Sequence, residues 1–86
     1  MKIRIAKFEL YPPELPKGYA IGFDITANQR SFYRDTLIAF EEIGNMTNEE
    51  MTNAAWEKLK QGILNEVNRL NEMPKLINGE WTPPEE

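Results

Sequence analysis

The segment YAIGFDITA, residues 19–27, decides the fold, because its apolar residues alternate strictly with small or polar ones. Successive side chains of a strand point to opposite faces of a sheet, so the odd positions from Tyr19 to Ala27 form one apolar face. The even positions form a small, polar face with Gly22 at its centre. Because glycine has no side chain to pack, Gly22 indicates a bulge or a group lying close over this second face.

A further strand is predicted for residues 32–42, after a turn at residues 28–31. Among the even positions from Phe32 to Phe40 only Arg34 is out of place, so the even positions are expected on the core face. Facing residues of an antiparallel pair have a constant sum of residue numbers. Odd core positions therefore meet even ones only across an even-numbered loop, which predicts a loop of two residues, 28–29, or of four, 28–31.

Residues 2–11 form the first predicted strand, but their apolar pattern changes phase in the middle. The two apolar pairs that share a face are Ile3 with Ile5, and Phe8 with Leu10. Both pairs can point inward only if an extra residue is inserted, so a bulge or bend is expected at Ala6–Lys7. The alternative is a strand that is buried on both sides at one end. Three prolines in residues 11–18 then predict a stiff, extended loop.

A capping box predicts the start of a long helix, because the Thr47 hydroxyl can accept from the Glu50 amide while the Glu50 carboxylate reaches back. The helix is expected over residues 48–72, ended by Pro74. At 100° per residue its apolar side chains fall within an arc of about 120°. These residues are Ala55, Trp56, Leu59, Ile63, Val67, Leu70 and Met73. Gly62 lies at the edge of this stripe, where a missing side chain should let a strand approach closely.

The predicted architecture is an α+β fold of β-β-β-α order: a three-stranded antiparallel meander, with one long C-terminal helix packed on one face and a short ordered tail. With 86 residues, the chain is expected to form a single domain, residues 1–86, with its sheet in residues 2–42 and its tail in residues 75–86. The expected core places Trp56, Leu59, Ile63 and Val67 on Ile21, Phe23, Ile38 and Phe40.

Composition excludes several classes of function. The chain has no cysteine and no histidine, so disulfides, Cys/His zinc sites and Ser-His-Asp catalysis are ruled out. Asp24 and Asp35 share the outer sheet face, but a flat face offers no water-excluding pocket. We therefore expect no metal, no cofactor and no enzymatic activity. No apolar run approaches the roughly 20 residues of a membrane span, and Lys2 and Arg4 interrupt the first apolar positions, so no membrane association and a cytoplasmic location are expected.

A protein-interaction or assembly module is the preferred functional hypothesis. Tyr33 and Leu37 leave an apolar strip on the outer sheet face, with a groove at Gly22. The tail carries three large apolar residues, which are Leu76, Ile77 and Trp81. The tail could cover its own outer face, but docking on a second copy in a homodimer is favoured. The small size and composition also suit an accessory protein of a mobile element.

Nucleic-acid binding through the open sheet face is the alternative hypothesis. The candidate phosphate contacts are Lys2, Arg4, Arg30 and Arg34. Residues 1–34 carry six basic and three acidic groups, whereas residues 35–86 carry four and eleven. A net charge of −4 opposes non-specific attraction to phosphate, which disfavours this hypothesis. The acidic second half suggests a further alternative, a decoy that inhibits a nucleic-acid-binding protein.

Overall fold

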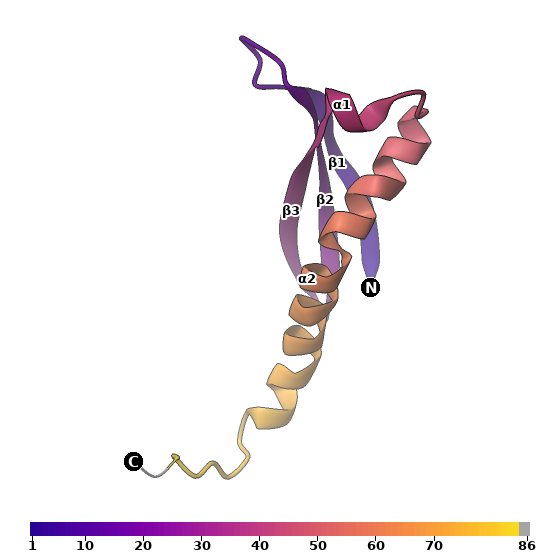
Figure 1. The fold of residues 1–86 in the computed structure, drawn as a ribbon. Coiled ribbons are helices and arrows are strands. Elements are labelled where there is room, and N and C mark those ends of the chain that lie inside the picture. The colour runs from indigo at the N-terminus through magenta and orange to yellow at the C-terminus, as the bar shows by residue number, and fades with distance from the viewer. Residues whose placement is uncertain (85–86) are drawn as a thin grey trace.

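A computed structural model of the chain describes residues 1–84 and confirms the α+β architecture (Figure 1). Its elements are β1 (Lys2–Tyr11), β2 (Gly18–Ala27), β3 (Arg30–Ala39), α1 (Phe40–Ile43) and α2 (Asn48–Leu76). The three strands form one antiparallel sheet in the order β1-β2-β3. The last two residues of the predicted tail, 85–86, lie outside the described residues.

The turn between β2 and β3 has two residues, which confirms the first of the two predicted loop lengths. Asn28 and Gln29 have φ angles of 50° and 64°, as required by the type I′ turn that suits the twist of a hairpin. Ile25 consequently lies opposite Phe32. The odd core positions of β2 thus meet the even positions of β3 along the whole hairpin.

The predicted bulge in β1 is confirmed, since the register with β2 shifts between Ile5 and Lys7. Ile5 lies opposite Phe23 before the shift, and Phe8 lies opposite Ile21 after it. The inserted residue keeps the apolar positions on both sides of the bulge on the same face as the core of β2.

The third strand ends earlier than predicted, because Phe40–Ile43 forms the short helix α1 instead of continuing the strand. β2 begins at Gly18, which pairs with Ala39, so residue 40 has no strand position opposite it. The amide of Phe40 donates to the carbonyl of Lys17 at 3.0 Å. The Phe40 side chain is 45% exposed, so its predicted place in the core was wrong.

The core lies between α2 and the inner face of β2 and β3. The largest fully buried side chains are Ile21, Ile25, Ile38 and Ile63. Val67 belongs to the same cluster, while Trp56 and Leu59 are partly buried against it. The Trp56 ring meets the Phe23 ring edge-on at 5.9 Å between centroids. Apart from Phe40, the predicted packing is confirmed.

The helix α2 begins at the predicted capping box but runs past Pro74 to Leu76, beyond its predicted end. Proline cannot donate to the carbonyl four residues earlier, which is that of Leu70. The side-chain amide of Asn28, in the β2–β3 turn, donates to this carbonyl instead, at 2.9 Å. The β2–β3 turn thus supplies the hydrogen bond that Pro74 cannot make, so the Leu70 carbonyl is not left unpaired inside the helix.

Exchanging Asn28 for glycine tests this contact, because glycine keeps the positive φ but removes the amide. We expect Asn28→Gly to lower the free energy of unfolding by about 1 kcal/mol. With Pro74→Ala also present, a backbone N–H can reach the Leu70 carbonyl, so Asn28→Gly should then cost less. Urea unfolding of the four variants of this cycle measures the difference. Equal costs in both backgrounds would contradict the assignment.

Candidate interaction surface

A single helix is too narrow to cover this sheet. An α-helix with its side chains is about 10–12 Å wide, and strands lie about 4.8 Å apart, so one helix covers about two strands. α2 packs mainly on β3 and β2. The inner face of β1 is left beside the helix rather than beneath it.

The uncovered residues form what we call the β1 apolar strip, consisting of Ile3, Ile5, Phe8 and Leu10. The exposed fractions of Ile3, Ile5 and Leu10 are 42%, 53% and 46%, although all three point to the core side of the sheet. Phe8 is partly buried because its ring contacts that of Tyr19, at 5.5 Å between centroids. The strip is a continuous apolar edge of the core that remains open to solvent.

Sequence reasoning missed the β1 apolar strip as an interaction site, because alternation showed only that its residues share the core face. The uncovered strand could have been predicted by comparing the width of one helix with the width of three strands. A sheet of three strands with one predicted helix must leave about one strand uncovered on that face.

Gly22 on the outer face lies under the ring of Tyr33. A Cβ atom at Gly22 would overlap the Tyr33 hydroxyl and lie 2.6 Å from Cζ. The sequence indicated such a close group, but the groove expected there is filled by this ring. The Tyr33 hydroxyl donates to Asp35 at 3.1 Å. Partial burial, reinforced by this hydrogen bond, raises the pKa of the Tyr33 phenol, which keeps it protonated.

Leu37 borders a shallow hollow of about 250 Å³ on the same outer face, lined in part by Lys7 and Tyr11. The hollow is open to solvent and smaller than the roughly 300–1,000 Å³ of typical ligand pockets. It offers neither the depth nor the exclusion of water that a buried reaction site needs.

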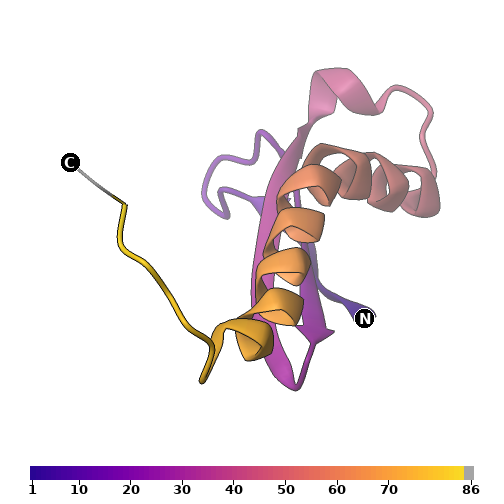
Figure 2. The same cartoon turned by 90° about the horizontal axis from the view of Figure 1, so that it is seen from below.

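The three apolar residues of the tail do not join Tyr33 and Leu37. Leu76 ends α2, which projects beyond the β2–β3 turn, and Ile77 and Trp81 follow it. Their side chains are 71%, 67% and 72% exposed, and the tail runs clear of the sheet in two perpendicular views (Figures 1 and 2). The structure thus shows no coverage of the outer face by the chain's own described tail, residues 77–84.

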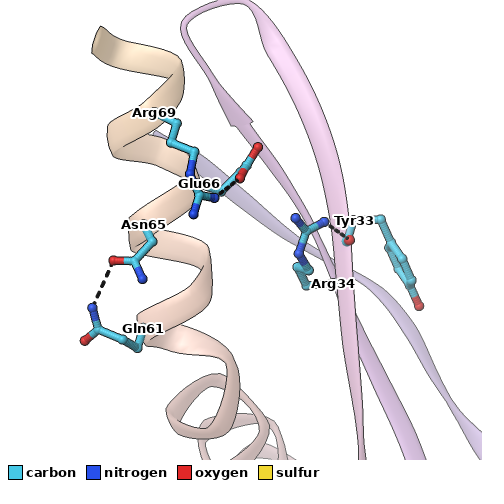
Figure 3. Close-up of polar contacts among 6 residues, drawn as sticks. All are labelled: Tyr33, Arg34, Gln61, Asn65, Glu66 and Arg69. Atoms are coloured by element: carbon cyan, nitrogen blue, oxygen red, sulfur yellow. Dashed lines mark hydrogen bonds and ion pairs between the residues drawn. The ribbon is translucent and has the colours of Figure 1, made fainter. Parts of the chain in front are cut away.

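The four candidate phosphate contacts lie on opposite faces of the sheet. Lys2 and Arg4 are on the outer face, where Arg4 forms an ion pair with Asp24 at 2.8 Å. Arg30 and Arg34 are on the core side. Figure 3 shows Arg34 pointing toward the side of α2 and Tyr33 pointing away from it. The open face therefore does not combine these cations into one patch.

Four of the seven acidic side chains of α1 and α2 form ion pairs with neighbouring cations. Four ion pairs of 2.6 to 3.3 Å join α2 to itself or to α1: Glu57–Lys60, Glu66–Arg69, Glu72–Lys75 and Glu42–Lys58. The hydrogen bond from Lys58 lowers the pKa of Glu42 below its ordinary value. The stabilisation from that contact is present above the ordinary pKa of Glu42 and lost as pH falls through the lowered one. Glu41, Glu49 and Glu50 belong to none of these four ion pairs, and the Glu50 carboxylate accepts from the Thr47 amide instead.

Within residues 1–84, no group of three or more acidic side chains is placed to hold a metal ion. No helix in that range is long and apolar enough to cross a bilayer. Comparison with protein-family models, curated proteins and solved structures finds no match to this chain.

Proposed function

We propose that this chain is a non-enzymatic assembly module that associates with other copies of itself through the β1 apolar strip. The observation that carries this proposal is the exposure of Ile3, Ile5 and Leu10, each more than two-fifths exposed although each belongs to the core face. Monomeric proteins rarely leave contiguous apolar residues of this kind in water without a partner.

The size of the exposed surface also supports assembly. The accessible surface is 6743 Å², whereas a compact monomer of 10.0 kDa exposes about 5,200 Å². The radius of gyration of 17.3 Å likewise exceeds the value of about 12 Å expected for this length. The projecting end of α2 and the tail contribute part of both differences.

Sedimentation equilibrium over a range of concentrations tests the proposal. We expect wild-type protein to have a mass above that of the monomer, and Ile5→Asp to be folded but monomeric. Leu15→Asp is the matched control, because Leu15 is 74% exposed in the loop before β2 and should leave the mass unchanged. A wild-type chain that stays monomeric up to millimolar concentration would overturn the proposal.

A further inference from the structure

The free edge of β1 carries backbone groups that are available for pairing with another strand. β2 is the central strand, so among the described residues, 1–84, one side of β1 has no strand beside it. An edge strand of ten residues presents a row of backbone N–H and C=O groups that can pair with another strand. The β1 apolar strip lies along this same edge.

The bulge makes the apolar pattern of β1 symmetric about its own centre. Ile5 and Ile3 are the first and third residues before the Ala6–Lys7 step, and Phe8 and Leu10 are the first and third residues after it. If two β1 strands pair antiparallel with a residue-number sum of 13, Ile3 faces Leu10 and Ile5 faces Phe8. Each such pair occurs twice, so every core-side residue meets an apolar partner.

In the same register, the outer-face side chains of one β1 strand lie opposite side chains of compatible charge on the other. Arg4 then faces Glu9 of the second copy, again twice, and Lys2 faces Tyr11. A sum of 11 would set Arg4 against Lys7, and a sum of 15 would set Lys7 against Phe8. Only the sum of 13 matches both faces along the whole strand, because neighbouring sums place like charges or residues of opposite faces together.

We infer that two copies pair their β1 strands antiparallel, with Arg4 opposite Glu9, to form one continuous six-stranded sheet. This inference rests on the proposed function and names its geometry. The two-fold axis is perpendicular to the sheet near Ala6–Lys7, so both α2 helices lie on the same face. The two β1 apolar strips then form a single band between the helices, and the free edges of both β1 strands are paired.

Charge exchange between Arg4 and Glu9 tests the register. Arg4→Glu and Glu9→Arg should each weaken self-association, by about tenfold, since like charges then face each other twice. An equimolar mixture of the two variants should recover dimers, because every facing pair in the mixed dimer is again opposite in charge. Sedimentation of each variant alone and of the mixture measures both effects, with circular dichroism to verify folding.

Disulfide trapping supplies a second measurement that does not depend on charge. The chain has no cysteine, so Arg4→Cys and Glu9→Cys introduce single thiols. Oxidation should yield a mixed disulfide dimer when the two variants are combined. Arg4→Cys alone should yield little, since two residues 4 lie five positions apart along the paired strands, roughly 17 Å, beyond the reach of a disulfide.

The possible failures are distinguishable. If wild-type protein assembles and Ile5→Asp abolishes assembly, but neither the charge-exchanged mixture nor the mixed disulfide forms, the β1 pairing is overturned and the proposed function stands. If wild-type protein is monomeric at all concentrations, both are overturned.

Discussion

Replacing Ile63 with alanine should lower the free energy of unfolding by about 2–5 kcal/mol. Ile63 is fully buried and belongs to the cluster that joins α2 to the sheet. Its truncation removes apolar contacts and leaves a cavity between two elements that cannot close completely around it. A chain of 86 residues has a total stability of only about 4–13 kcal/mol, so the variant should be unfolded to a substantial extent at physiological temperature.

Urea unfolding followed by circular dichroism measures this effect. Leu76→Ala is the matched control, because Leu76 lies on the same helix but is 71% exposed and should leave the midpoint nearly unchanged. If assembly adds stability, both variants should be compared at equal and low concentration. Equal midpoints for Ile63→Ala and wild type would contradict the assigned core.

Gly18→Ala should destabilise the protein by about 2–3 kcal/mol, although it adds a single methyl group. A Cβ atom at Gly18 would overlap the carbonyl oxygen of Ile38 and lie 2.8 Å from the Cα atom of Ala39. Both atoms belong to the backbone of β3, so the clash cannot be relieved by turning a side chain. The end of the β2–β3 pair must separate, with loss of strand hydrogen bonds at that point.

Gly62→Ala is the control for Gly18→Ala, because the same added methyl group should here raise the free energy of unfolding instead of lowering it. The sequence suggested that a strand approaches Gly62 closely, which was wrong: the residue is exposed, and within residues 1–84 no atom outside the adjacent helix backbone lies within 4 Å of a Cβ atom built there. Alanine should therefore stabilise α2 by about 1 kcal/mol. Thermal or urea unfolding in which the two alanine variants shifted in the same direction would contradict this account.

Most of the local structure followed from sequence patterns because each has a nearby physical cause. The alternation in residues 19–27 determined which side chains share a face of β2. The change of phase in β1 required an inserted residue, and matching odd to even positions required an even-numbered turn. The capping box at Thr47 located the start of α2, since its donors and acceptors lie within one turn.

Other features were decided by groups that are distant in sequence. Pro74 was expected to end α2, but Asn28, more than forty residues earlier, satisfies the carbonyl that the proline cannot. Phe40 leaves the sheet because no residue of β2 remains opposite it. The ring of Tyr33 fills the place over Gly22 that the sequence left as a groove. Each outcome depends on which partner the folded chain brings there.

The sequence by itself determined the faces of the strands and of the helix, because the direction of a side chain follows from the backbone repeat alone. Which faces are covered was decided only by the tertiary structure. Ile25 and Ile3 lie opposite each other on the same face, yet Ile25 is fully buried and Ile3 is 42% exposed. The reason is the path of α2 over β2 and β3, since a helix about two strands wide cannot also cover β1.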